Sequence, residues 1–579
     1  MLRCAAPLLL VCAPAAMAPQ QPPPRPNIVL VMTDDQGLGD FSAAGNPVLE
    51  TPRLDAFAAQ CPKVERFYVC PVCSPTRASL MTGRYHYRTR VVDTWIGRSM
   101  MEPAETTLAE RLRAAGYRTG IFGKWHLGDC YPMRAIDQGF DEALVLRGGG
   151  LAQPADPIEN GRRYTDPVLV HDGRLEPSEG YCTEVFFDGA LRFVDAAAAA
   201  GQPFFVYLAT NAPHDPLHDV PEDLLAKYRG KQMKPALRGG KQDDAQADRV
   251  ARVFAMEEDI DRNFGRLLDH LDAKGLSDDT IVVFLCDNGP TPGRFVRDLR
   301  GHKGAVHEGG VRSPLFVRWP GRLSPETRVA HIAAHIDLVP TLCAAAGIPL
   351  PADAGIDGRD LLPLLRGADE DWPAREIVLQ AHRGNAPIVG HNCAVIGDRW
   401  KLVRASGFSD APAKDAHWAL FDLSADPGER HDVAAANPEV TARLREVYGA
   451  WFADVSSTRA DNYAPPRIRP GTVHEPETTL THQDWRPADG QGWGHAGVYL
   501  LQFDDACRLD VTLLFLESRR VDEVVVRQNG VAVTLQVGAT GAKLPIGEIA
   551  FAGGAVDLEI VCKAGDETFA PHQIVLARR

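Results

Sequence analysis

The chain has no excess of positive charge. Its 579 residues include 62 lysines and arginines against 76 aspartates and glutamates, which gives a formal net charge of −14. Proteins that bind nucleic acids concentrate Lys and Arg on one face or stripe, so this balance argues against a nucleic-acid partner. It also disfavours long-range capture of polyanions, and an anionic substrate would have to be held by a few local cations.

Long apolar runs are missing after residue 18, so we expect no membrane span. Residues 1–18 have the features of a secretory signal peptide, because Arg3 supplies a positive start, residues 8–11 form a short apolar centre, and residues 16–18 fit a cleavage site of small residues. We therefore expect a secreted or periplasmic protein. A lipoprotein signal that ends at Cys12 is the alternative, and the bulky valine before it makes this less favoured.

The sequence has too few cysteines, too unevenly spaced, to indicate a disulfide framework. Of the 12, Cys4 and Cys12 lie in the signal segment and Cys73 is considered below. One or two disulfides stay open, and Cys61 and Cys70 are the nearest pair in sequence. The nine remaining cysteines are Cys61, Cys70, Cys130, Cys182, Cys286, Cys343, Cys393, Cys507 and Cys562.

Four apolar runs predict strands that are buried on both faces, which is typical of parallel sheets. They are Asn27–Thr33, Thr119–Gly123, Phe204–Ala209 and Ile281–Cys286. Segments with helical spacing alternate with them, as in Thr183–Ala200, and this implies right-handed crossovers. We therefore predict an α/β fold with a large, mostly parallel sheet flanked by helices.

Each of these four runs is followed by residues that bind metals or transfer protons. In open α/β sheets ligands bind beyond the carboxyl ends of the strands, so we expect these side chains to meet there. Two adjacent acids repel each other unless a cation lies between them, which favours a metal site. Taken singly, each residue is more often structural than catalytic. The residues are Asp34 and Asp35, Lys124 and His126, His214, and Asp287 and Asn288.

Composition divides the chain into five parts. They are a signal peptide (1–18), an α/β domain (19–375), a small antiparallel-sheet subdomain (376–455), a proline-rich linker (456–478) and an all-β, sandwich-like accessory domain (479–579). In the last part, Asn529-Gly530 predicts a hairpin turn. Inside the α/β domain, residues 146–180 predict a long loop, and residues 220–250 are expected to be mostly exposed.

The stretch Cys73-Ser74-Pro75-Thr76-Arg77 predicts the start of a helix, because proline fits the first helical turn. Cys73 and Arg77 would then lie four residues apart on one face, where their side chains can meet. The helix N-terminus and the arginine both favour negative charge on the group that Cys73 carries. By itself the pattern is short, and a small buried cysteine beside a surface arginine is the alternative.

The longer stretch from Cys73 to Tyr85 resembles a signature of the type I sulfatases. A second stretch, Gly116–Gly128, resembles the other signature of this family, which belongs to the alkaline phosphatase superfamily. The two stretches occur in the family's order. The resemblance covers about residues 26–455, and Leu420–Glu429 is similar to part of the smaller C-terminal subdomain of sulfatases. More weakly, the C-terminal region resembles the β-domain appended to some bacterial arylsulfatases.

The resemblance implies an arylsulfatase-type sulfuric ester hydrolase in which a formylglycine-generating enzyme oxidises Cys73 to Cα-formylglycine. It also implies a calcium ion, with position 73 as a further oxygen donor. Hard oxygen donors fit a hard cation, and the set contains no thiolate or imidazole that would indicate a softer metal. The implied calcium ligands are Asp34, Asp35, Asp287 and Asn288.

By the same resemblance, one hydroxyl of the hydrated aldehyde attacks sulfur and expels the alcohol. Asp287 is the expected base on that hydroxyl, and His126 takes the proton of the second hydroxyl, which regenerates the aldehyde. His214 is the expected acid. The remaining cations hold the sulfate oxygens and steady the negative charge, which is the expected main source of rate. The implied catalytic set is Cys73, Arg77, Lys124, His126, His214 and Lys303.

The signal peptide and the accessory domain favour a sulfated glycan as substrate. Loops after the strands are expected to select the sugar, and the candidates are residues 92–99, with Trp95 and Arg98, and residues 146–180. Packing for Trp95 and a surface position for Arg98 are equally good interpretations. His307 stands where many sulfatases have an aromatic residue, so we expect it to alter the pocket wall.

Three alternatives stay open. The first is a phosphonate or phosphate-ester hydrolase of the same superfamily, because phosphoryl and sulfuryl groups share their shape. The second is a catalytically silent glycan-binding protein in which Cys73 remains a thiol, although the intact Lys124 and His126 argue against it. The third concerns Trp485, Trp493 and Tyr499, which could form a carbohydrate platform, with aromatic core packing as the better interpretation.

Overall fold

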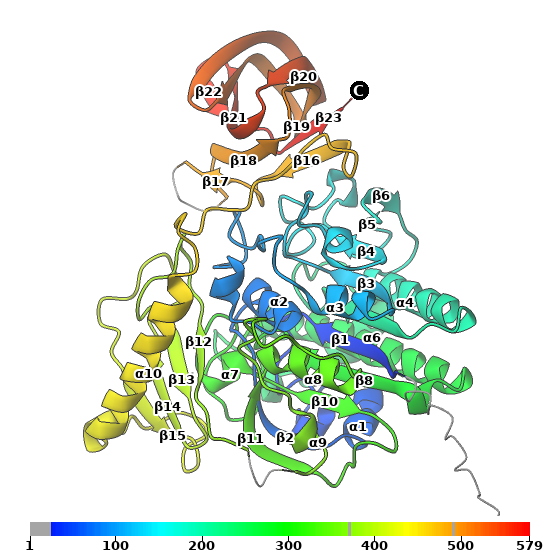
Figure 1. The fold of residues 1–579 in the computed structure, drawn as a ribbon, viewed down its shortest axis with the longest axis vertical. Coiled ribbons are helices and arrows are strands. Elements are labelled where there is room, and N and C mark those ends of the chain that lie inside the picture. Colours follow the sequence, from blue (N-terminus) through cyan, green and yellow to red (C-terminus); the bar gives the residue numbers. More distant parts are fainter. Residues whose placement is uncertain (1–24, 369–371, 489–492, 579) are drawn as a thin grey trace, which may run out of the picture.

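The computed structural model describes residues 25–368, 372–488 and 493–578. The predicted signal peptide therefore lies outside the described residues. The chain folds into three parts: a large unit of sheet and helices, a small sheet with one long helix at the side of this unit, and a β region at one end (Figure 1). Among the described residues, no helix has the length and apolar character that crossing a bilayer requires.

The large unit is built on an eight-stranded sheet in the order β10-β8-β1-β7-β3-β4-β5-β6. The five strands from β8 to β4 are parallel, and the outer strands are antiparallel to their neighbours. This confirms the predicted α/β fold. The strands are β1 (Asn27–Thr33), β3 (Arg118–Lys124), β4 (Glu142–Leu146), β5 (Val168–His171), β6 (Arg174–Pro177), β7 (Phe204–Ala209), β8 (Thr280–Cys286) and β10 (Leu315–Arg318).

The two faces of β1 explain why its sequence is apolar throughout. Val29 and Val31 face one core, and Ile28, Leu30 and Met32 face the other, all at 0% exposure. A strand covered on both faces leaves no position for a solvated side chain. The first core is closed by α1 (Pro52–Ala58), α4 (Cys182–Ala199) and α6 (Asp244–Ala273), and the second by α2 (Cys73–Thr82), α3 (Leu108–Ala114) and α8 (Leu338–Ala345).

Two segments are more ordered than the sequence predicts. The expected loop 146–180 contains the hairpin of β5 and β6, which extends the sheet. All four residues of β6 are exposed, so the strand has no apolar alternation to predict it. The expected exposed segment 220–250 contains α5 (Glu222–Arg229), which buries Leu224 and Tyr228, and the first turns of α6.

Two smaller sheets lie beside the large one. A three-stranded sheet has the order β11-β2-β9, and a four-stranded antiparallel sheet has the order β12-β13-β14-β15 with α10 (Pro438–Ser456) packed on it. Lys401 of β14 joins this sheet to the large unit, because its Nζ lies 2.8 Å from Glu308 Oε1 and 3.0 Å from Glu429 Oε1. The strands are β2 (Lys63–Tyr68), β9 (Arg312–Ser313), β11 (Arg328–Ala334), β12 (Ile377–Gln380), β13 (Cys393–Ile396), β14 (Trp400–Arg404) and β15 (Ala419–Asp422).

The C-terminal region is all-β and antiparallel, as predicted. Asn529 and Gly530 join its two longest strands in a two-residue turn with φ of 50° and 81°, which only such residues adopt readily. Trp485 and Tyr499 are each 1% exposed, so the core-packing interpretation is right and the carbohydrate platform is wrong for them. The strands are β16 (Glu477–Thr481), β17 (Arg486–Pro487), β18 (Gly497–Phe503), β19 (Cys507–Gln528), β20 (Val531–Phe551), β21 (Gly554–Ala564), β22 (Glu567–Phe569) and β23 (Gln573–Ala577).

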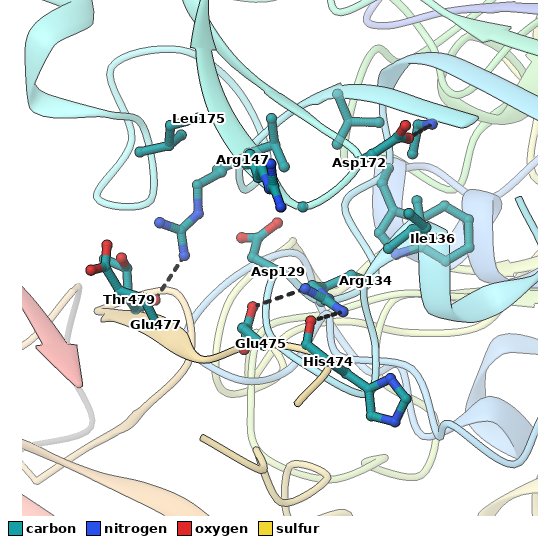
Figure 2. A pocket seen from close by; sticks show the side chains of 18 of the residues that line it. Asp129, Arg134, Ile136, Arg147, Asp172, Leu175, His474, Glu475, Glu477 and Thr479 are labelled. Atoms are coloured by element: carbon teal, nitrogen blue, oxygen red, sulfur yellow. Dashed lines mark hydrogen bonds and ion pairs between the residues drawn. The ribbon is translucent and has the colours of Figure 1, made fainter. Parts of the chain in front are cut away.

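A cavity of about 540 Å³ lies where the β region meets the large unit (Figure 2). Arg147 Nη2 donates to the Thr479 carbonyl oxygen over 2.7 Å, and Arg134 Nη2 donates to the His474 carbonyl oxygen over 3.1 Å. The residues that line the cavity include Trp125 but none of the predicted catalytic or metal-binding residues. The charged walls of this cavity therefore hold the β region against the large unit, and Trp125 and Gly128 of the lining lie close to His126 in the sequence.

All ten cysteines within the described residues are free. This includes Cys61 and Cys70, which are both buried, so no disulfide forms between them. The alternative of one or two disulfides, which the sequence left open, is therefore wrong for the part of the chain that the structure describes.

Candidate active site

Helix α2 begins at Cys73, as the proline at its third position predicts, and all ten of its residues are buried. Arg77 lies one turn later and points at the sheet edge. Its Nε and Nη2 donate to Asp287 Oδ2 over 3.2 and 2.8 Å, and its Nη1 donates to the Lys124 carbonyl oxygen over 2.8 Å. The helix therefore places Cys73 and Arg77 against residues that follow β8 and end β3.

The acidic residues after β1 and β8 meet at one point. Asp35 N donates to Asp287 Oδ1 over 3.2 Å, and Asn288 Nδ2 donates to Asp35 Oδ1 over 2.8 Å. Carboxylate oxygens of Asp34 and Asp287 and the sulfur of Cys73 all lie within 4.8 Å of one another. The parallel pairing of β1 with β8, with Thr33 opposite Cys286, brings these side chains together.

Three cations balance the three carboxylates. Lys124 forms an ion pair with Asp34, Lys303 Nζ lies 2.6 Å from Asp35 Oδ1, and Arg77 pairs with Asp287. Side chains in the first pair are fully buried. A divalent cation added to this balanced cluster would leave it positive, which suits an anionic substrate.

Two buried oxygen atoms in the cluster have no hydrogen-bond partner among the described residues. They are Asp34 Oδ1 and Asn288 Oδ1. Buried polar atoms are almost always paired, so an orphaned pair at one point indicates a ligand. Carboxylate and amide oxygens are the ligands that calcium takes, and the residues present therefore fit a calcium ion.

The buried charges shift the pKa values of the acids in opposite directions. Burial alone would raise the pKa of Asp34, but the nearby cations, Lys124 first among them, hold it well below its usual range. Burial and the charge of Asp34 raise the pKa of Asp287 to about 7. Burial also raises the pKa of the Cys73 thiol, with Lys124 and Lys303 opposing it. For the unmodified thiol, burial therefore outweighs the nearby cations.

His126 is arranged to accept a proton. Its Nε2 lies 2.7 Å from the Thr94 carbonyl oxygen, which can only accept, so Nε2 carries the hydrogen. Burial and the charge of Lys124 hold the pKa of His126 well below its ordinary value, so the ring is neutral and Nδ1 has a free lone pair. Nδ1 is buried and has no partner among the described residues.

His126 and Asp35 are both in the left-handed backbone region, with φ of 61° and 64°. Residues with side chains are uncommon there and cluster at functional sites, where the surrounding structure fixes them. The backbone conformation of these two residues therefore indicates a functional site at the same place as the side-chain contacts do.

His214 and Lys303 lie on either side of Asp35. His214 Nδ1 donates to the Asp215 carbonyl oxygen over 2.7 Å, and its Nε2 is 3.8 Å from Asp35 Oδ2. Burial and the charge of Lys303 lower the pKa of His214, so its resting form is neutral. Burial would lower the pKa of Lys303, but the charge of Asp35 raises it, so this amine stays protonated.

The segment 146–180 passes close to both histidines through Gly149 and Gly150. A Cβ on Gly149 would lie 2.5 Å from His126 Nε2, and one on Gly150 would lie 3.1 Å from His214 Nδ1. The missing side chains let the backbone approach the imidazoles, so this segment forms part of the site wall.

The family model described as Sulfatase matches residues 26–348, which is more than half of the chain. The protein is a sulfatase. A second model, described as N-sulphoglucosamine sulphohydrolase, C-terminal, matches residues 302–448. The predicted membership of the sulfatase family and the predicted hydrolysis of sulfate esters are thereby confirmed.

Two curated relatives of this sulfatase extend the comparison. The N-acetylgalactosamine-6-sulfatase of Canis lupus familiaris is 33% identical over 76% of this chain and 88% of its own length. The arylsulfatase A of Homo sapiens is 32% identical over 76% of this chain and 89% of its own length. Both alignments leave about a quarter of this chain outside.

A solved structure has the same fold. The crystal structure of Ps i-CgsB in complex with k-i-k-neocarrahexaose is 26% identical, covers 75% of this chain and 94% of its own length, and superimposes with a TM-score of 0.65. The putative sulfatase yidJ from Bacteroides fragilis, at 21% identity and a TM-score of 0.62, supports the fold alone.

Three residues predicted to bind substrate in this sulfatase are partly or wholly buried. Trp95 is half-buried, and its Nε1 donates to Asp93 Oδ2 over 3.0 Å. Arg98 is 3% exposed, so the surface interpretation is wrong, and its Nε donates to Asn385 Oδ1 over 2.8 Å. His307 lies just before α7 (Glu308–Val311), and burial with the charge of Lys401 lowers its pKa to about 3.

Sequence reasoning missed the contribution of the β region to the site wall. Gln483 Nε2 donates to the Thr94 carbonyl oxygen over 3.1 Å and to Ser99 Oγ over 2.9 Å. The same Thr94 oxygen accepts from His126. A backbone carbonyl oxygen that accepts hydrogen bonds from two distant segments leaves no pattern in the sequence. No sequence signal could therefore have predicted the contact between Gln483 and Thr94.

Proposed function

We propose that this sulfatase hydrolyses the sulfate ester of a sulfated carbohydrate, and of synthetic aryl sulfates, with Cys73 converted to formylglycine and one bound calcium ion. The observation that carries the proposal is the meeting of Cys73 with the orphaned oxygens of Asp34 and Asn288 and with the cations Arg77, Lys124 and Lys303.

A sulfated carbohydrate is favoured as substrate by the relatives. Besides the N-acetylgalactosamine-6-sulfatase of Canis lupus familiaris, they include the N-acetylgalactosamine-6-O-sulfatase of Bacteroides thetaiotaomicron, which is 28% identical over 73% of this chain. The Ps i-CgsB structure holds a carrageenan-type hexaose, k-i-k-neocarrahexaose. Aryl sulfates are included because arylsulfatase A is among the relatives.

Calcium would be held by Asp34, Asp35, Asp287 and Asn288 and would supply positive charge beside position 73. Formylglycine, as its hydrate, would supply the hydroxyl that attacks sulfur. We also propose the formylglycine-generating enzyme as a partner, and a secreted or periplasmic location, which the pattern of residues 1–18 supports.

Two residues near position 73, His126 and Asp287, each accept one proton in the proposed reaction. His126 Nδ1 is the acceptor for the proton that must leave after sulfate transfer, because it is unpaired while Nε2 is fixed on Thr94. Asp287, whose carboxylate lies beside position 73, is the proposed base for the attacking hydroxyl.

The departing alcohol needs a proton or a cation. Lys303 remains charged beside Asp35 and can hold the sulfate oxygens and the leaving oxygen. His214 as the acid requires a proton on Nε2, which its lowered pKa removes in the resting state, so substrate binding must supply the negative charge that restores it. Arg77 and Lys124 hold the negative charge that develops on the transferred group.

The five-part division of the chain, with boundaries after residues 18, 375, 455 and 478, is proposed along with this function. It is supported by the separate core of the small sheet, whereas the core of the β region also includes Ile96, Met100, Cys130 and Met133 of the α/β domain.

The experiment has two parts. Mass analysis of the tryptic peptide Phe67–Arg77 from protein expressed with a formylglycine-generating enzyme should find an aldehyde in place of the Cys73 thiol. The same protein should cleave sulfated mono- and oligosaccharides and an aryl sulfate, and chelation should stop it. If position 73 is modified and phosphonate esters are cleaved while no sulfate ester is, the proposed reaction is wrong.

A further inference from the structure

Arg383 lies between two aromatic rings at the wall of the active site. Its Cζ is 4.4 Å from the centroid of the Trp95 ring and 4.5 Å from that of the Phe408 ring. Its Nη1 donates to Asp93 Oδ1 over 2.9 Å and to Thr94 Oγ1 over 3.2 Å. The side chain is 27% exposed. A guanidinium that packs on two rings and donates hydrogen bonds to two side chains has few orientations open to it.

Each ring lies next to a residue that contacts, or is adjacent in sequence to, one of the proposed catalytic residues. Trp95 follows Thr94, whose carbonyl oxygen accepts from His126 Nε2 over 2.7 Å. Phe408 lies against Gly304, where an added Cβ would be 3.2 Å from the Phe408 Cβ, and Gly304 follows Lys303. Arg383 therefore lies between the segment that holds His126 and the loop that carries Lys303.

Two nitrogen atoms of the Arg383 side chain, Nε and Nη2, are free to donate hydrogen bonds to a ligand. Both of its hydrogen bonds to described residues leave from Nη1, and none of the described residues accepts from Nε or Nη2. Neither of these atoms is buried without a partner, so they face solvent. Nε and Nη2 form one edge of the guanidinium fork, and that edge matches the two oxygens of a carboxylate or sulfate.

The charges around Arg383 favour an anion. Arg98, Arg383 and Arg486 gather around one fully buried carboxylate, Asp93, while Asp410, 3.5 Å from Arg98, is 61% exposed. Burial and the charge of Arg98 lower the pKa of Arg486 to about 9, so the two guanidinium groups lie close enough to repel each other. This local excess of cations stands out in a chain whose net charge is −14.

We propose that Arg383 binds a second anionic group of the substrate, so that the preferred substrate is a sulfated sugar that carries a carboxylate or another sulfate beside the scissile one. The inference rests on the proposed function and names its substrate class. Trp95 and Phe408 are positioning residues, because they hold the guanidinium plane, and Asp93 fixes the edge that does not meet the substrate.

The test compares three matched oligosaccharides by kcat/KM. One carries only the scissile sulfate, one carries a second sulfate, and one carries a uronate carboxylate instead. Hydrogen bonds between ionised partners are among the strong ones, so we expect wild type to prefer a doubly charged substrate about tenfold or more. Arg383→Gln should abolish this ratio, and Arg383→Lys should restore part of it. Added salt should reduce the wild-type ratio.

Arg118 provides a matched control. Its side chain is 30% exposed, its Cζ lies 4.8 Å over the Phe193 ring, and it pairs with Glu142 at 3.4 Å. It begins β3, at the opposite end from Lys124. Arg118→Gln should leave the preference for the doubly charged substrate as in wild type.

The outcomes separate the two proposals. A preference limited to the second sulfate or to the carboxylate identifies the group that Arg383 binds. Equal kcat/KM for all three sugars in wild type overturns the inference. A decrease in kcat/KM in Arg383→Gln that is equal for all three sugars also overturns it. In both cases the proposed sulfatase function is unaffected. If wild type with modified Cys73 cleaves no sulfate ester, the proposed function itself fails. Should Arg383→Gln not fold, Phe408→Leu removes one ring, and an unchanged ratio in that variant overturns the inference.

Discussion

Replacing Arg77 with methionine tests whether the balanced charges of the active site hold it together. Arg77 and Asp287 are both 0% exposed, and the arginine donates twice to Asp287 Oδ2 and once to the Lys124 carbonyl oxygen. Methionine fills a similar volume but removes the charge and all the donors. Removing one partner of a buried ion pair leaves the other charge uncompensated and costs about 3–5 kcal/mol.

The loss should depend on calcium. In Arg77→Met without the metal, Lys124 is left to offset both Asp287 and Asp34, and the pKa of Asp287, which Arg77 holds down, should rise further. With calcium bound, the metal takes over part of the neutralisation. We therefore expect Arg77→Met to lower the free energy of unfolding by about 3–5 kcal/mol in chelator and by less in excess calcium.

The assay is urea unfolding of wild type and variant, each with chelator and with calcium, followed by aryl sulfate hydrolysis. Arg118→Met is the control, because Arg118 and Glu142 form a part-exposed pair that should contribute no more than about 1 kcal/mol. If Arg77→Met in chelator costs no more than Arg118→Met, the argument that buried charge balance stabilises this site is refuted.

Three further predictions follow from the same structure. Cys73→Ala should fold but lose turnover of an aryl sulfate, and turnover comparable to wild type would contradict a covalent role. Calcium at about a thousandfold over its Kd should stabilise wild type by about 4 kcal/mol, and Asp35→Asn should lose most of this shift in thermal denaturation. Burial and the charge of Glu184 raise the pKa of Asp259 to about 7, so the folded protein binds this proton more tightly than the unfolded chain and loses stability as pH rises from about 4 to 7. Asp259→Asn should therefore stabilise the protein at pH 8, by up to about 4 kcal/mol, and have no such effect at pH 4.

Elements buried on both faces were the ones that the sequence could predict. β1 and β8 appear as uninterrupted apolar runs because each side chain enters one of two cores. Their polar ends meet because parallel pairing aligns Thr33 with Cys286. Position in the topology and residue type together therefore predicted where the acids would gather.

Elements with one solvated face, or with buried charge, were harder to predict. β6 is exposed along its whole length, and α6 buries Glu257, Asp259 and Asp261, which obscure its apolar stripe. Arg383 could not be predicted as part of the site, because it reaches Asp93 across 290 positions of sequence through a contact that no local pattern records. Burial also raises the pKa of the unmodified Cys73 thiol, and the sequence alone does not show how deeply this residue is buried.

The carbonyl oxygen of Thr94 joins three segments that lie far apart in the chain. It accepts from His126, the proposed proton acceptor, and from Gln483 of the β region, and Gln483 also donates to Ser99. Removing the β region would therefore take away one of the two donors that hold the oxygen on which the His126 ring is oriented. The C-terminal region thus contributes to the geometry of the proposed site even though it supplies none of the proposed catalytic residues.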